Sequence, residues 1–132
     1  MAEATLTRKH VSSKNEGGTA QLAAAMTGTG ASDYARCFGY LIRTIEVKNP
    51  AGGSDLIFTV EGGFKRTDGT FDWYTLATRA DASASFATTA RTLATNAGVI
   101  YEVSPTPVTD FIRLNVSDAT ASGANAWVHV EL

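Results

Sequence analysis

Cysteine and histidine are almost missing from this sequence. Cys37 is the one cysteine among 132 residues, so no disulfide can form within the chain. The two histidines, His10 and His129, stand far apart, and no Cys/His group has the spacing of metal ligands. We therefore predict no metal site and no cofactor.

The sequence also has no long apolar run. None approaches the roughly 18 residues of a membrane-spanning helix, and the start MAEATLTRKH lacks the apolar core of a secretory signal. These absences predict a protein that has no signal peptide and makes no contact with a membrane. It is made in a reducing cytoplasm and either stays there or leaves by a route that needs no signal, such as cell lysis.

Charged residues are scarce, at 18% of the chain, and 11 basic against 13 acidic residues leave a net charge of -2. Affinity for nucleic acid comes mainly from Lys and Arg on the phosphate backbone, so this balance argues against a nucleic-acid partner. The length fits one domain, and a hydrophobic fraction of 44% is enough for a buried core.

Few residues of the sequence can carry out chemistry. A serine hydrolase needs a base beside its nucleophile, but His129 lies in an alternating segment that favours a surface or interface position. Asp68 and Asp72 flank a turn, and turn chemistry accounts for their spacing. We therefore predict no catalytic residue, and a protein that is not an enzyme.

Residues 1–33 have a different composition from the rest, with few large apolar side chains and no aromatic one. Such a stretch cannot bury enough apolar surface to offset the entropy lost on ordering it. It is predicted to be an extended or flexible N-terminal arm, either disordered or ordered on a neighbouring subunit, and a folded part of the core is the remaining alternative. For an arm that binds a neighbour, the expected contact residues are Leu6, Arg8, Val11, Leu22 and Met26.

From Tyr34 onward, short β-prone runs are separated by turn residues. The runs alternate apolar and polar residues, which is typical of antiparallel strands with one buried face. Residues 80–97 are ambiguous between helix, strand and loop, and a weak strand near 86–93 is favoured. The seven predicted strands are 38–48, 56–64, 71–78, 86–93, 98–103, 111–116 and 126–132.

This pattern predicts an all-β fold, an antiparallel and jelly-roll-like β-sandwich of about seven or eight strands over residues 34–132. No strong amphipathic helix is present to connect parallel strands. A sandwich with these limits should fold without the first 33 residues.

Aromatic residues on outward faces are the candidates for binding. If Val128 and Val130 point inward, Trp127 points outward, and tryptophan is enriched in the centres of interfaces. We therefore predict that Trp127 contacts a partner. A sugar-binding platform would need Trp127 together with Trp73 or Tyr74, and the latter two are adjacent and must face opposite ways.

Several motifs of residues 34–132 occur in one order. They are FTVEG at 58–62, the turn Asp68-Gly69, the pair Trp73-Tyr74, FIRLNVS at 111–117 and the closing strand Val128–Val130. In this order the sequence resembles small structural proteins of tailed bacteriophages.

That resemblance implies a virion component made in the host cytoplasm, either a head decoration (cement) protein or a head–tail or tail accessory protein. Its partners would be the major capsid protein or other virion subunits, and the protein itself would be a homo-oligomer, with a trimer as a reasonable form. A receptor-facing adhesin and a carbohydrate-binding β-sandwich module remain as alternatives.

Overall fold

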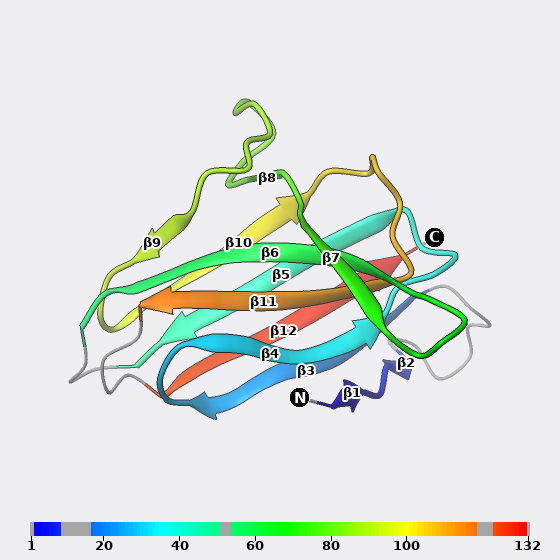
Figure 1. The fold of residues 1–132 in the computed structure, drawn as a ribbon. Helices are drawn as coiled ribbons and strands as arrows, with labels where there is room; N and C mark the ends of the chain where they lie inside the picture. The colour runs from blue at the N-terminus through cyan, green and yellow to red at the C-terminus, as the bar shows by residue number, and fades with distance from the viewer. Residues whose placement is uncertain (1, 9–16, 51–53, 119–122, 132) are drawn as a thin grey trace.

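The computed structural model describes residues 2–8, 17–50, 54–118 and 123–131. Within these ranges the chain forms twelve β-strands and no helix, and the strands make two six-stranded sheets that pack face to face (Figure 1). The prediction of an all-β, mainly antiparallel sandwich is confirmed, although the strands outnumber the seven or eight predicted.

We call the two layers sheet 1 and sheet 2. In sheet 1 the strand order is β1-β4-β11-β6-β7, and β9 also pairs with β6. Its strands are β1 (Glu3–Ala4), β4 (Gly30–Arg36), β6 (Leu56–Lys65), β7 (Phe71–Thr75), β9 (Arg91–Leu93) and β11 (Phe111–Asp118). In sheet 2 the order is β2-β3-β12-β5-β10-β8. Its strands are β2 (Thr7–Arg8), β3 (Gly17–Met26), β5 (Ile42–Asn49), β8 (Thr78–Arg79), β10 (Ala97–Val103) and β12 (Ala124–Glu131).

The long strands turn alternate side chains into the space between the sheets. In β12, Ala126, Val128 and Val130 are fully buried, whereas Trp127 and His129 between them are half-buried on the outer face. The same alternation in the other long strands builds one core cluster. Each large apolar side chain buried there stabilises the fold by roughly 1.5–3 kcal/mol.

Consecutive strands mostly lie in different sheets, as in a jelly roll. β3 in sheet 2 is followed by β4 in sheet 1, then β5 in sheet 2 and β6 in sheet 1. β12 pairs with β3 on one side and β5 on the other, so the last strand in the sequence lies in the middle of sheet 2. Hydrogen bonds between distant parts of the chain therefore close the sandwich.

The predicted domain boundary at residue 33 is wrong, because residues 17–33 belong to the sandwich. β3 pairs along its length with β12, and β4 pairs with β11. Leu22 is 1% exposed and belongs to the core with Ala20 and Ala23. These strands gain their burial from small side chains packed between two sheets, and such side chains give no clear alternating pattern in the sequence.

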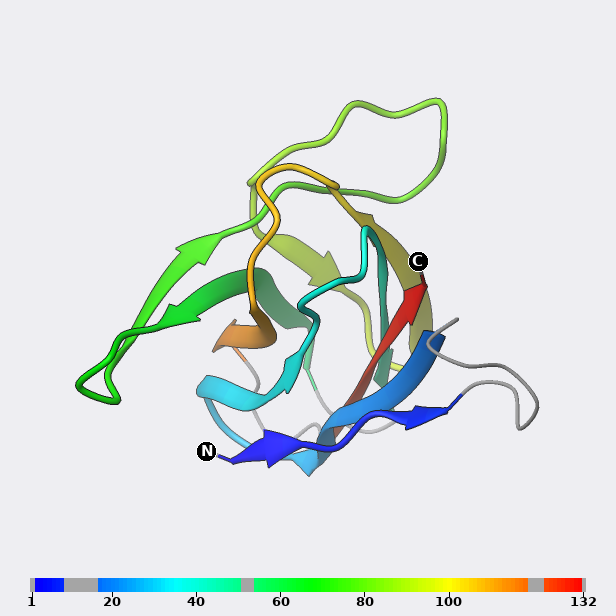
Figure 2. The ribbon, with the colours of Figure 1, turned by 90° about the vertical axis from the view of Figure 1, so that its right-hand side faces the viewer.

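Residues 2–8 form a short strap across the edges of both sheets (Figure 2). β1 pairs with β4 in parallel, and β2 pairs with β3 in antiparallel fashion. Leu6 packs against the core, and Gly18 permits the close approach, because a Cβ there would lie 3.0 Å from the carbonyl oxygen of Thr7. The strap covers edges that would otherwise be open to pairing.

Each of the seven predicted strands has a counterpart in the structure. The strand that was predicted to be weak, 86–93, has the shortest counterpart. Only Arg91–Leu93 of the predicted strand 86–93 forms a strand, while Ala87 makes an isolated bridge with Thr78. Residues 80–90 otherwise form a loop between β8 and β9, which projects from the sandwich in Figures 1 and 2.

Candidate functional site

Four aromatic rings gather on the outer face of sheet 1, and we call them the aromatic cluster. They are Tyr34 of β4, Phe111 of β11, and Phe71 and Trp73 of β7. Phe71 and Trp73 are stacked with their ring centroids 5.4 Å apart, and Tyr34 meets Phe111 edge to face at 5.4 Å. Such aromatic pairs add about 0.5–1.5 kcal/mol each beyond their burial, so the cluster holds the edge strand β7 against the sheet.

A glycine in the middle of β6 makes this cluster possible. Gly63 pairs with Phe111 on one side and Trp73 on the other. A Cβ on Gly63 would lie 2.5 Å from Cε3 of Trp73, so the indole ring occupies the space of the missing side chain. A glycine inside a strand often marks such a close approach, and this is the sequence signal that could have located the cluster.

An ion pair between β11 and β6 lies beside the aromatic cluster. Arg113 donates a hydrogen bond from Nε to Oε1 of Glu61 at 2.8 Å, and both side chains are mostly buried. The guanidinium carbon of Arg113 lies 4.0 Å from the centre of the Trp73 ring. The indole is therefore held by a cation–π contact as well as by its neighbouring rings.

At the end of the aromatic cluster lies an open hollow of about 300 Å³. It is lined by Arg36, Phe38, Lys65, Asp110 and Phe111. The cations lie near rings: Arg36 Cζ is 5.4 Å from the centre of Phe111, and Lys65 Nζ is 5.8 Å from the centre of Phe71. The hollow thus combines two exposed cations with one carboxylate and aromatic walls.

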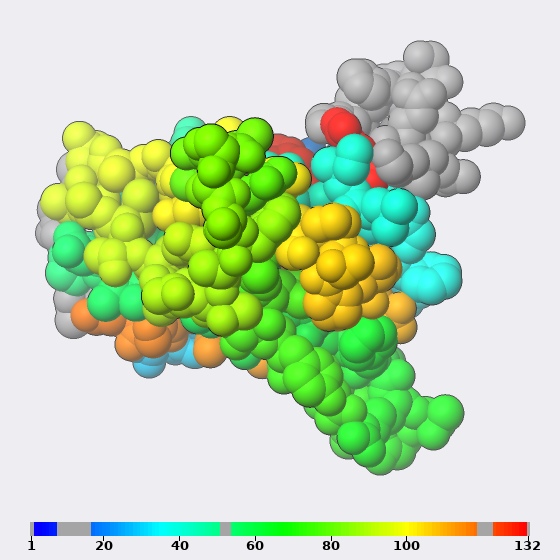
Figure 3. All heavy atoms as spheres, turned by 90° about the horizontal axis from the view of Figure 1, so that it is seen from above, coloured from blue at the N-terminus to red at the C-terminus, as the bar shows by residue number. Residues whose placement is uncertain are grey.

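Beside the hollow, large apolar side chains are exposed at one end of the sandwich. Phe38 is 66% exposed, Leu41 56%, Ile42 51% and Val108 41%, and we call these four residues the end patch. Figure 3 shows their segments, the corner before β5 in cyan and the 104–110 loop in amber, next to one another at this end of the molecule. Large apolar side chains exposed on neighbouring segments are typical of interaction sites in soluble proteins.

Hydrogen bonds join the two segments that carry the end patch. The Cys37 amide donates to the carbonyl of Asp110 at 2.8 Å. The buried side chain of Arg43 donates from Nη2 to the carbonyls of Ser104 and Pro107, at 2.6 and 3.1 Å. These hydrogen bonds hold the two segments of the end patch together, so its residues do not lie on independent loops.

The interior of this end contains the one cysteine. The Cys37 thiol is fully buried and donates to the carbonyl of Thr109 at 3.0 Å. Burial raises the pKa of this thiol above its usual value, although the nearby Arg43 guanidinium acts in the opposite direction. Cys37 is accordingly a neutral packing residue at physiological pH.

The outer face of sheet 2 carries Trp127 and a chain of polar contacts. His129 is joined through Nδ1 to the Thr19 hydroxyl at 2.9 Å and through Nε2 to Glu46 at 3.1 Å. Lys48 Nζ lies 5.7 Å from the centre of the Trp127 ring. Trp127 is half-buried on this face, and its role as a partner contact stays a prediction.

The contact residues predicted in the N-terminal segment are not brought together. Leu22 is a core residue, so the prediction that it contacts a partner is wrong for the folded chain. Leu6 and Met26 are half-buried against the core. Arg8 lies in β2, and Val11 falls outside the described residues.

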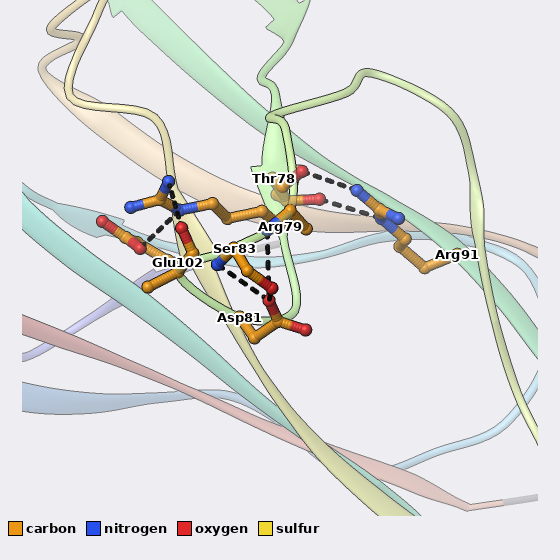
Figure 4. A network of polar contacts seen from close by, with 8 residues as sticks. Thr78, Arg79, Asp81, Ser83, Arg91 and Glu102 are labelled. Atoms are coloured by element: carbon orange, nitrogen blue, oxygen red, sulfur yellow. Dashed lines mark hydrogen bonds and ion pairs between the residues drawn. The ribbon is translucent and has the colours of Figure 1, made fainter.

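The projecting loop 80–90 is fixed at its base by two arginines (Figure 4). Arg91 donates to the hydroxyl and the carbonyl of Thr78, at 3.0 and 2.5 Å, and Arg79 donates to Glu102 at 2.8 Å. At the tip, hydrogen bonds from Ser83 hold the pKa of the Asp81 carboxyl below its usual value. The loop is an ordered projection.

The three aromatic candidates for a sugar platform lie apart. Trp73 is inside the aromatic cluster, and Trp127 lies on the outer face of the other sheet. Tyr74 is 57% exposed and alternates with Trp73 along β7. These residues therefore do not form one platform.

The described residues contain no group of three or more His, Cys, Asp or Glu side chains arranged to hold a metal ion. Nor do they include a helix with the length and apolar character of a membrane span.

Comparison with known proteins gives a likeness of fold. No family model matches the sequence, and no curated protein matches it. The structure of the SPBc2 prophage-derived protein YomS matches 92% of this chain and 98% of its own length, with a TM-score of 0.62 and 12% sequence identity. At this identity the match shows that the two chains share a fold.

Two weaker matches are carbohydrate-binding modules of family 22. One is a xylan-binding domain, and the other is the C-terminal module of Clostridium thermocellum Xyn10B. Each match covers 97% of this chain and 78% of the module, with a TM-score of 0.40 and 13% identity. A TM-score this low does not establish a common fold.

Proposed function

We propose that this protein is a non-enzymatic structural subunit of a tailed-phage particle, and that it decorates the capsid by resting its end patch on the major capsid protein. The observation that carries the proposal is the end patch itself. Phe38 and Leu41 are more than half exposed on a corner that hydrogen bonds brace from within. Exposing large apolar side chains on a rigid support is costly in solution and favourable against a partner.

The fold likeness supports a phage origin. The YomS match spans nearly all of both chains, so this chain and a prophage-derived protein are built on the same sandwich. The motifs of residues 58–62, 111–117 and 128–130 lie in β6, β11 and β12, the strands that form the centre of the two sheets.

A repeated lattice makes a small contact surface sufficient. Each subunit of a symmetric shell offers the same site, and a homo-oligomer that engages several sites at once binds far more tightly than one copy. Light scattering on the purified protein measures this oligomeric state, and a trimer is the expected form.

The experiment that tests the proposal is to purify particles of the phage whose genome carries this gene and to analyse their proteins by mass spectrometry and immunogold labelling. The proposal expects many copies per particle and label over the head. Label confined to the neck, tail or fibre tips would favour an accessory protein or an adhesin instead. Absence from the particles would overturn the proposal.

A second measurement tests the surface. Particles from a strain that lacks the gene are incubated with purified protein and sedimented. Exchanging Phe38 and Leu41 for Ser should weaken binding by about tenfold or more, since each removes an apolar anchor. The matched control is Tyr74→Ser, because Tyr74 is 57% exposed on β7, outside both the end patch and the outer face of sheet 2. The Trp127→Ala variant tests in the same assay whether that face also binds.

A further inference from the structure

The hollow beside the end patch carries positive charge that the described structure does not neutralise. Within residues 2–8, 17–50, 54–118 and 123–131, no carboxylate forms an ion pair with Arg36 or Lys65. The neighbouring cations are engaged, since Arg113 pairs with Glu61 and Arg66 with Asp72.

The local charge has the opposite sign to that of the whole molecule. The hollow is lined by two cations and one carboxylate, whereas the chain carries a net charge of -2. Asp110 is half-buried, while Arg36 and Lys65 are exposed. An approaching ligand therefore meets the cations at the mouth of the hollow, and electrostatic complementarity favours an acidic group.

The walls of the hollow define the rest of the ligand. Phe111 is 4% exposed and contributes to the lining, and Phe38 is 66% exposed and belongs to the end patch as well. A ligand that places a carboxylate at the cations therefore reaches apolar surface within the same contact. An extended protein segment with an acidic residue next to an apolar or aromatic one has this combination.

We propose that the hollow binds an acidic side chain of the partner protein, with its carboxylate between Arg36 and Lys65 and the adjacent apolar side chain against Phe38. This inference rests on the proposed function and names the chemistry of the partner's contact segment. A nucleic acid fits less well, because a phosphate backbone needs a row of cations and gains little from the exposed aliphatic residues of the end patch.

The first test uses the full-length protein, labelled with ¹⁵N, and a capped pentapeptide Gly-Leu-Glu-Phe-Gly. We expect amide shifts at Arg36, Phe38, Lys65 and Phe111, and about tenfold weaker binding by the peptide with Gln in place of Glu, since charge-assisted hydrogen bonds are lost. Shifts spread elsewhere, or equal binding of the two peptides, would overturn the inference. So would a thymidine octamer that shifts the same amides at equal affinity.

Two double variants separate the hollow from general charge. Arg36→Gln with Lys65→Gln should reduce both peptide and particle binding by about tenfold. Lys48→Gln with Arg66→Gln removes the same charge from side chains that are 61% and 63% exposed outside the hollow, and should leave peptide binding within about twofold. Loss of binding in both double variants would mean nonspecific attraction.

The two proposals can fail separately. If the peptide binds at the hollow while the particles contain none of the protein, the proposed function fails and the acidic-segment site stands. If the particles bind the protein through the end patch while neither peptide nor particle binding depends on Arg36 and Lys65, the function stands and this inference fails.

Discussion

The indole ring of Trp73 lies over Gly63, in the place where any other residue of β6 would carry a side chain. This contact lets β7, the edge strand of sheet 1, reach across β6 to Phe111 and Tyr34. The aromatic cluster, which lies next to the proposed docking site, therefore requires that residue 63 has no Cβ.

Gly63→Ala should destabilise the protein by about 1–3 kcal/mol, because the added methyl overlaps the ring and forces Trp73 from its place. Urea unfolding measures the loss, and near-UV circular dichroism reports the aromatic cluster. Gly98→Ala is the matched control, since its Cβ would meet Lys48 at an ordinary 3.5 Å, and it should change stability by no more than about 0.5 kcal/mol. Equal effects of the two substitutions would contradict this account.

Arg43 is expected to be the most sensitive charged position. It is 1% exposed and donates to the Thr109 hydroxyl and to two carbonyls of the 104–110 loop. Arg43→Met leaves these buried acceptors without a donor and should cost about 3 kcal/mol. The Nε of Arg43 has no hydrogen-bond partner among the described residues, so the effect arises at its two Nη groups.

Urea unfolding and hydrogen exchange of residues 104–110 check this prediction. Faster exchange there should accompany the loss of stability, because Arg43 holds the loop to the corner of the end patch. Arg36→Met serves as the control at an exposed arginine, with a change within about 0.5 kcal/mol. A stable Arg43→Met protein with a protected loop would show that packing alone holds this end.

The buried thiol of Cys37 should make the stability of the protein depend on pH in the alkaline range. Burial raises the pKa of its thiol in the folded state above the usual value of 9.0, so the folded protein keeps the proton that the unfolded chain loses. The stabilisation is complete below pH 9 and is lost as the pH rises toward the folded pKa. The free energy of unfolding should therefore fall more steeply above pH 9 in the parent protein than in Cys37→Ala. Parallel curves would contradict the prediction.

Two truncations compare how much the strap and the strands β3 and β4 contribute to the stability of the fold. Removing residues 1–8 takes away β1, β2 and the contact of Leu6, and should cost about 1–3 kcal/mol while leaving a cooperative unfolding transition. Removing residues 1–33 also takes away β3 and half of β4, so β12 and β11 lose partners, and no cooperative transition is expected. Thermal unfolding followed by circular dichroism compares the two, and a folded 34–132 fragment would restore the boundary predicted from composition.

The sequence predicts the strands that carry large alternating side chains. Large apolar residues such as Ile45 and Phe58 recur at every second position in these strands, and this alternation predicts them from the sequence. They are β5, β6, β10, β11 and β12. The sequence does not predict β3 and β4, because much of their buried surface comes from small residues such as Ala20, Ala23 and Ala35. Small apolar residues do not separate a strand from a flexible segment.

The site was less accessible to sequence reasoning than the fold. Tyr34, Phe71 and Phe111 come together only because the strand order places β4, β11, β6 and β7 in succession. Neither spacing nor composition contains that order. The end patch likewise depends on a corner and a loop about 65 residues apart, joined through Arg43.

The central position of β12 in sheet 2 has a consequence for biosynthesis. β3 and β5 cannot complete their hydrogen bonding until Ala124–Glu131 has left the ribosome, so the sandwich forms after translation of these residues rather than during it. Until then the nascent chain exposes two unsatisfied strands to its neighbours on the polysome. Chaperone occupancy during synthesis is therefore expected to last until the final strand inserts.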